Sequence, residues 1–186
     1  METQGIRPEN LFIWMMIEAL LVLMVGTFLR KKRNVSWRML CFSYLLIVYA
    51  SILLAITILR RPGGSRAGIV HLYINLGLGL LGGPPSLFVA AFAFYNMLLF
   101  LPMGMFVFYH YRNVDPAMGI LKTTVVGFIV SLIIECSQLI TGRGMFELTD
   151  IFTNTGGCFV GAIIAFLIHE CRKSFCYGAH YESING

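Results

Sequence analysis

The feature that most constrains this chain is a series of apolar runs long enough for a helix to cross a lipid bilayer. About 18–20 apolar residues suffice for one crossing. Runs of this kind cover Leu11–Leu29, Met39–Leu59, Leu87–Tyr109, Thr123–Thr141 and the slightly shorter Ile151–Ile168. The composition agrees, because 58% of the 186 residues are hydrophobic and 12% are charged, against roughly 25% charged in soluble domains. We expect one all-α domain over residues 1–186, a polytopic membrane helix bundle of about five transmembrane helices.

A sixth apolar segment, "IVHLYINLGLGLLGGPPS" from Ile69 to Ser86, differs from these runs. Only about a dozen residues precede its Gly-Gly-Pro-Pro break, and segments of that length are more often re-entrant, interfacial or core segments than spans. We therefore expect residues 69–81 to be re-entrant, with a full crossing as the alternative. His71 and Asn75 either join a polar site from this segment or contact water at the interface.

The basic residues indicate an orientation. The densest basic stretch, "RKKRNVSWR", separates the first two runs and is placed in the cytoplasm, which puts the N-terminus outside and the C-terminus inside. Arg112, Lys122, Arg172 and Lys173 agree with this orientation, whereas Arg60, Arg61 and Arg66 oppose it. The formal net charge is +5, and the basic residues are concentrated between the apolar runs. They therefore indicate membrane topology and not a nucleic-acid partner. The five cysteines lack metal-ligand spacing, so no metal or cofactor is predicted.

Polar side chains gather where the last two runs meet, in "IIECSQLITGRGMFELTDIFTNTGG". Glu135, Gln138 and Gly142 follow i, i+3 and i+7, which places them on one helix face. An ionisable residue well inside a span indicates a functional site, so Glu135 is the strongest candidate. Arg143, in the loop between the two helices, would pair with an acidic neighbour (Glu147 or Asp150) or with an external anion.

The last helix carries a second polar face. Asp150, Asn154, Gly157 and Gly161 follow i, i+4, i+7 and i+11, and the two glycines have the small-xxx-small spacing that lets helix backbones approach closely. Asp150 falls in the expected first turn, where the helix dipole favours a carboxylate.

Two further polar residues, Glu18 and Asn96, lie at comparable depth in the first and third runs if the orientation holds. We therefore expect a polar pocket that opens outward. The alternatives are simpler. Asn96, Gln138 and Asn154 would be interhelical hydrogen-bond partners, Asp150 a helix cap and Arg143 a solvated loop residue.

These residues resemble a known family. The pattern E-x-x-Q, a loop arginine and D-x-x-x-N-x-x-G is similar to the C-terminal signature of VanZ-like membrane proteins, and "YNMLLFLPMGMF", with Asn96, Pro102 and Gly104, resembles another stretch of that family. The resemblance implies a bacterial plasma-membrane protein, and it implies low-level resistance to the lipoglycopeptide teicoplanin.

The residues and what the resemblance implies together lead to three function classes. The first is a cell-envelope binding or resistance protein whose partner is a membrane lipid, a lipid-linked wall component or teicoplanin. The second is an intramembrane enzyme that modifies a lipid or the antibiotic, with Glu135 as acid or base and Arg143 stabilising an anion. The third is a small transporter subunit, which five spans and no visible repeat make the weakest hypothesis. Whether the chain is an enzyme is left open.

Overall fold

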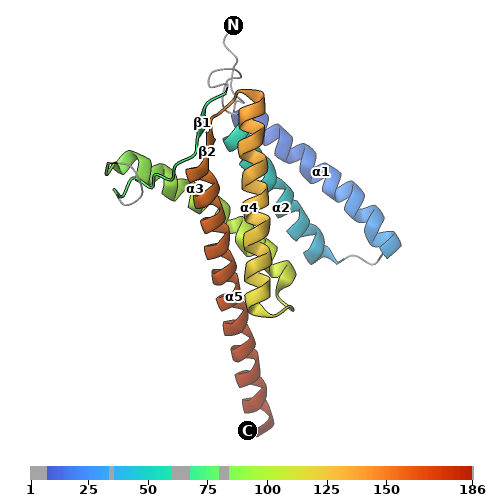
Figure 1. Ribbon diagram of the computed structural model, residues 1–186. Coiled ribbons are helices and arrows are strands. Elements are labelled where there is room, and N and C mark those ends of the chain that lie inside the picture. Colours follow the sequence, from blue (N-terminus) through green and yellow to red (C-terminus); the bar gives the residue numbers. More distant parts are fainter. Residues whose placement is uncertain (1–7, 34–35, 60–67, 80–83, 186) are drawn as a thin grey trace. The chain divides into compact units, whose positions relative to one another are not determined.

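The structure, a computed structural model, describes residues 8–33, 36–59, 68–79 and 84–185 (Figure 1). Its elements in chain order are α1 (Pro8–Arg33), α2 (Trp37–Leu54), a π-helical turn η1 (Ala55–Leu59), β1 (Val70–His71), α3 (Leu87–Tyr111), α4 (Pro116–Thr141), β2 (Phe146–Glu147) and α5 (Leu148–Asn185). The all-α expectation is confirmed, and the two short strands are an addition that the sequence did not predict. Arg60, Arg61 and Arg66 lie outside the described residues.

The chain is a membrane protein by the length and apolarity of its helices. Among the described residues, four stretches are long and apolar enough to cross a bilayer: Leu40–Ile58, Leu87–Tyr111, Pro116–Thr141 and Leu148–Ser174. The apolar stretch of α1, Ile13–Phe28, is shorter, so a crossing by the first helix stays a prediction.

The chain divides into two compact units. Unit 1 comprises Met1–Ile69 and Ser137–Met145, and unit 2 comprises Val70–Cys136 and Phe146–Gly186. The helix α4 therefore contributes its last residues to unit 1 and the rest to unit 2. The single domain expected over 1–186 stays a prediction.

Unit 1 is held together by small-residue packing and a few polar bonds. Gly26 of α1 lies against the Leu40 side chain of α2. The Ser51 hydroxyl donates a hydrogen bond to a carboxylate oxygen of Glu18, so this acidic residue has a partner on the neighbouring helix.

The end of α4 corrects one expectation. Gly142 was expected on the face of Glu135 and Gln138, but α4 ends at Thr141 and Gly142 has φ +61°. Its N–H donates to the Leu139 carbonyl at 3.3 Å, and the Arg143 N–H donates to the Gln138 carbonyl at 3.1 Å. This pair of bonds is a Schellman cap, in which a left-handed glycine ends the helix.

In unit 2, α3 and α5 run parallel with their backbones in close contact. A Cβ atom at Gly157 would overlap the Met97 carbonyl, and one at Gly161 would overlap the Leu101 carbonyl four residues further along α3. Further down, the rings of Phe108 and Phe166 pack edge-on at 6.2 Å between centroids. We call the contact between these two helices the glycine seam.

The helix α4 runs antiparallel to α5 in the same unit. Near its start, the Thr123 carbonyl accepts a bond from the Cys158 thiol, and eight residues later Ser131 accepts one from Asn154. Cys158 is fully buried beside the glycine seam. The core of unit 2 therefore lies where α3, α4 and α5 meet.

The segment before α3 is extended and irregular. β1 pairs in parallel with β2, with Val70 opposite Phe146 and His71 opposite Glu147. The described residues 68–79 contain no helix, so the alternative of a helical crossing is wrong for them, and His71 and Asn75 do not share a helix face. The depth of this segment in the membrane, and with it the expected re-entrance, stays a prediction.

Candidate functional site

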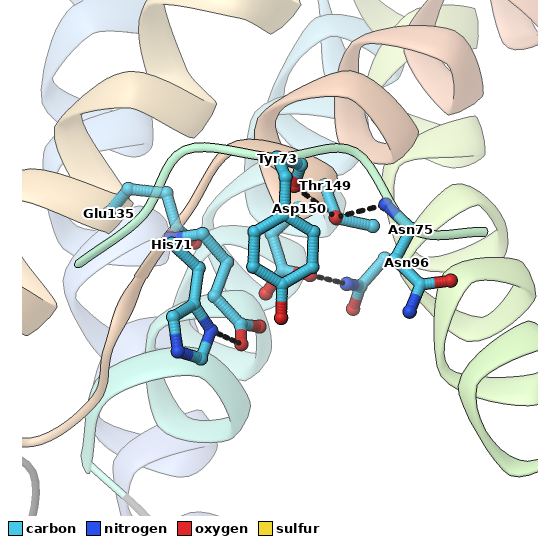
Figure 2. Close-up of polar contacts among 8 residues, drawn as sticks. His71, Tyr73, Asn75, Asn96, Glu135, Thr149 and Asp150 are labelled. Atoms are coloured by element: carbon cyan, nitrogen blue, oxygen red, sulfur yellow. Dashed lines mark hydrogen bonds and ion pairs between the residues drawn. The ribbon is translucent and has the colours of Figure 1, made fainter. Parts of the chain in front are cut away.

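Polar side chains of unit 2 gather around β2 and the start of α5. Figure 2 shows them: Glu135 comes from α4, Asn96 from α3, His71 from β1, and Thr149 and Asp150 from α5. Together with Glu147 of β2, we call these residues the polar cluster. Segments as far apart in sequence as β1 and α5 meet here because the two-residue ladder brings β1 to β2, directly before α5.

Glu135 is the most deeply buried acidic residue of the cluster. It is 1% exposed, and its Oε2 atom accepts a hydrogen bond of 2.9 Å from the backbone N–H of Glu147. A buried carboxylate is tolerated when hydrogen bonds replace the lost water. Glu135 therefore holds the backbone of β2 through this hydrogen bond, and its side chain is too buried to contact a ligand.

Asn96 and Asp150 form a bond between helices. The Asn96 side-chain amide donates to Oδ1 of Asp150 at 2.7 Å. Asp150 lies in the first turn of α5, as expected, where the partial positive charge of the helix end favours its carboxylate. Both side chains are half-buried, so this pair, unlike Glu135, is within reach of a molecule at the surface.

His71 and Glu147 pair across the short ladder. The distance between His71 Nδ1 and Glu147 Oε1 is 3.3 Å, and the two residues are direct partners in the strand register. Their side chains are 36% and 30% exposed. A carboxylate at one ring nitrogen orients the imidazole and sets which nitrogen carries the proton.

Thr149 ties the segment that follows β1 to the start of α5. Its hydroxyl accepts a bond of 3.0 Å from the Asn75 N–H and donates one of 3.2 Å to the Tyr73 carbonyl. Figure 2 shows both bonds. The Thr149 hydroxyl thus pairs with one backbone donor and one backbone acceptor of this irregular segment. Without it, both groups would need water as a partner.

Asn154 lies one turn deeper than Asp150 and turns toward a different helix. Its side-chain amide donates to Ser131 of α4 at 2.9 Å, while its buried Oδ1 atom has no hydrogen-bond partner among the described residues. The expected polar face of α5 is therefore split: Asp150, Gly157 and Gly161 contact α3, and Asn154 contacts α4.

The predicted residues do not all belong to one unit. Glu135, Asn96, Asp150 and Asn154 lie in unit 2, whereas Gln138, Arg143 and Glu18 lie in unit 1. The Gln138 amide donates to the Thr57 carbonyl at 3.1 Å within unit 1, which is the interhelical role that the sequence offered as its alternative. A shared pocket with Glu18, Gln138 and Arg143, and a pairing of Arg143 with Glu147 or Asp150, stay predictions.

Sequence reasoning missed three residues that the structure brings to this region, and it named Glu147 only as a partner for Arg143. The positions of Thr149 and Tyr73 and the pairing of Glu147 with His71 depend on the β1–β2 ladder, and strands of two residues leave no sequence pattern to detect. Ser131 had a signal, since Ser131, Glu135 and Gln138 follow i, i+4 and i+7 and so share a helix face.

The chemistry of the cluster is that of hydrogen-bond acceptors. An ionised carboxylate is a hydrogen-bond acceptor and not a donor. The half-buried Asp150 and Glu147 therefore suit a ligand that offers hydroxyl or N–H groups. No group of three or more His, Cys, Asp or Glu side chains able to hold a metal ion is found among the described residues.

The comparisons with known proteins identify the family. No curated protein and no solved structure matches the chain. A family model described as VanZ/LLP1 matches residues 19–169, a range that includes every residue of the polar cluster. The chain therefore belongs to the VanZ/LLP1 family.

Proposed function

We propose that this chain is a cell-envelope protein of the bacterial plasma membrane whose polar cluster faces outward and binds the headgroup of an amphiphile. The amphiphile is teicoplanin or a lipid-linked wall component, and binding gives low-level teicoplanin resistance. The observation that carries the proposal is the polar cluster itself, in which a buried carboxylate, Glu135, supports acidic and amide groups between apolar helices. Ionisable groups in such surroundings mark functional sites.

The charges of unit 2 support the outward orientation. The acidic residues of the cluster lie at one end of the unit, at the start of α5. The basic residues lie at the other end of the helices: Arg112, Lys122, Arg172 and Lys173. Arg172 follows Leu148 by about 36 Å along α5, at ~1.5 Å per residue, which exceeds the hydrocarbon thickness of roughly 30 Å. By the positive-inside rule, the basic end is cytoplasmic and the polar cluster external.

Aromatic rings accompany the charges at the basic end. The Arg112 guanidinium lies 4.2 Å from the centroid of the Tyr109 ring, and the Lys122 ammonium lies 5.7 Å from that of Tyr111. Tyrosine and basic side chains are typical of the membrane–water interface. This arrangement supports an interface at the α3–α4 turn, opposite the polar cluster.

The geometry favours binding over an enzyme that uses Glu135. At 1% exposure and bonded to the Glu147 N–H, this carboxylate cannot contact a substrate in this structure. A general acid or base must come within hydrogen-bond reach of the proton that it transfers. Glu135 therefore positions the cluster, and the half-buried Asn96–Asp150 pair contacts the ligand.

Teicoplanin susceptibility in a sensitive bacterial host tests the proposal. Asp150→Asn removes the charge but keeps an oxygen that accepts the Asn96 bond, so the fold is retained. We expect the wild-type chain to raise the inhibitory concentration of teicoplanin and Asp150→Asn to abolish the increase at equal membrane abundance. Glu170→Gln, at the basic end of α5, is the matched control and should behave as wild type. An Asp150→Asn variant as protective as the wild type would contradict the proposal.

A further inference from the structure

The segment Val70–Gly79 is attached to unit 2 mainly through polar groups, and we call it the strap. Its attachments are the ladder with β2, the His71–Glu147 pair and the two bonds to Thr149. At its far end the Gly77 carbonyl accepts a bond from the Ser86 N–H, at the start of α3. Figure 2 shows the strap running from His71 past Tyr73 to Asn75, with the Thr149 hydroxyl bonded to the backbone of the last two residues.

One ring of the strap, His71, pairs with the Glu147 carboxylate, and a second ring, Tyr73, lies beside the first. The centroids of the His71 and Tyr73 rings are 5.5 Å apart, with the planes tilted by 35°. Tyr73 is 55% exposed, and the His71 and Glu147 side chains are about one-third exposed. The Nδ1 atom of His71 is the one that meets Glu147, so Nε2 lies on the other side of the ring. The strap and Glu147 of β2 thus present an aromatic ring, a carboxylate and a ring nitrogen, each of them partly exposed.

This combination selects a class of ligand. An aromatic face packs against the C–H face of another ring, while a carboxylate accepts hydrogen bonds from hydroxyl groups. A sugar ring offers both surfaces. An anionic headgroup would instead meet the carboxylates of Glu147 and Asp150, and like charges repel. A purely apolar ligand would displace water from the Glu147 carboxylate without replacing the lost hydrogen bonds, which costs free energy.

The neighbours of these residues indicate how such a ligand is held. Val70 and Leu72, on either side of His71 in the chain, are 45% and 70% exposed. In a membrane protein, exposed aliphatic side chains next to polar groups belong at the boundary between acyl chains and headgroups. A ligand with its headgroup at Tyr73 and Glu147 can therefore keep its acyl chains in the bilayer.

We propose that Tyr73, His71 and Glu147 bind the sugar headgroup of a glycolipid. The inference rests on the proposed function for the outward orientation, and it deepens that function by naming the headgroup chemistry. Tyr73 supplies the ring surface, Glu147 accepts from a sugar hydroxyl, and His71, oriented by Glu147, contacts a second hydroxyl through Nε2. Glu135 positions Glu147 through its backbone N–H.

The test measures lipid binding to the full chain in phosphatidylcholine nanodiscs by native mass spectrometry. The probes share the same acyl chains: diglucosyl-diacylglycerol, plain diacylglycerol and phosphatidylglycerol. We expect the sugar-bearing lipid to bind at least ~10-fold more tightly than either other probe. Tyr73→Ala and Glu147→Gln should each reduce this preference about 10-fold, whereas Tyr73→Phe, which keeps the ring, should retain it.

Equal binding of the three probes would overturn the inference, and so would a preference for phosphatidylglycerol or a sugar preference that survives in both Tyr73→Ala and Glu147→Gln. Glu147→Gln keeps the backbone N–H that bonds Glu135, so it tests the site even where Tyr73→Ala fails to fold. The outcome is separate from that of the proposed function. If Asp150→Asn loses teicoplanin protection and the wild type shows no sugar preference, the proposed function stands and the glycolipid inference fails. If the wild type prefers the sugar-bearing lipid but gives no protection, the glycolipid inference stands and the proposed function fails.

Discussion

The glycine seam and the strap, both in unit 2, are held by opposite means. In the seam, α3 and α5 approach until glycines face backbone carbonyls, and no polar side chain takes part at Gly157 and Gly161. The strap contributes exposed apolar side chains and is attached through hydrogen bonds to Thr149, Glu147 and the β2 backbone. The seam should therefore be sensitive to volume and the strap to hydrogen-bonding capacity. Closely packed helices and a hydrogen-bonded segment thus both contribute side chains to the polar cluster.

The largest expected effect is in the seam. Gly157→Ala places a methyl group against the Met97 carbonyl, and overpacking of this kind costs on the order of 3 kcal/mol. Gly156→Ala is the matched control, because its Cβ would lie 3.8 Å from the end of the Met97 side chain. Thermal unfolding in detergent should show a clearly lower midpoint temperature for Gly157→Ala and an unchanged midpoint for Gly156→Ala. Equal midpoints for the two variants would show that the seam is looser than described.

The next effect concerns Glu135 of α4, which bonds the backbone of β2. Glu135→Ala leaves the partly buried Glu147 N–H without its acceptor, which costs on the order of 1–2 kcal/mol. Glu135→Gln keeps an acceptor oxygen and should cost clearly less. Thermal unfolding of both variants measures the difference. If the Glu135→Ala and Glu135→Gln variants are equally stable, the hydrogen bond from Glu135 to β2 contributes nothing to stability.

A smaller effect is expected for the Asn96–Asp150 bond. Hydrogen bonds between membrane helices contribute about 0.6 kcal/mol on average, so a double-mutant cycle of Asn96→Ala and Asp150→Ala should give a coupling near that value. Denaturant unfolding of the two single variants and the double variant measures it. A coupling of zero would mean that the bond shown in Figure 2 does not persist in the membrane.

The smallest effect on global stability is expected in the strap. Thr149→Val keeps the shape but loses both bonds to the strap backbone, whereas Thr149→Ser keeps the hydroxyl. Because such a segment opens locally, the change should appear in hydrogen exchange and not in the unfolding midpoint. Faster exchange over residues 70–79 in Thr149→Val alone is the predicted result. Unchanged exchange would mean that the ladder with β2 is sufficient to hold the strap.

The helices were predictable because their signals are local. Apolar runs gave the five helices, and helical spacing put Asp150, Gly157 and Gly161 on the face that contacts α3. The same spacing predicted Asn154 to share that contact, but its amide reaches Ser131 instead. A face more than one turn long can meet two neighbouring helices, and periodicity alone does not say where one contact gives way to the next.

The strap was not predictable in the same way. Its fold depends on pairing His71 with Glu147, 76 positions apart, and a two-residue ladder leaves no alternating pattern to detect. The end of α4 was misplaced for a related reason: Gly142 fits the helical spacing of Glu135 and Gln138, yet its left-handed backbone ends the helix. Local spacing does not distinguish a glycine that packs from a glycine that caps.

Cysteine accessibility in intact cells measures whether the polar cluster lies at the outer face of the membrane. In a background with the five native cysteines replaced by alanine, Tyr73→Cys reports on the strap and Asn113→Cys, exposed in the α3–α4 turn, on the basic end. A membrane-impermeant maleimide should label Tyr73→Cys in intact cells and Asn113→Cys only after permeabilisation. Labelling of Asn113→Cys alone in intact cells would place the polar cluster on the cytoplasmic side and contradict the account.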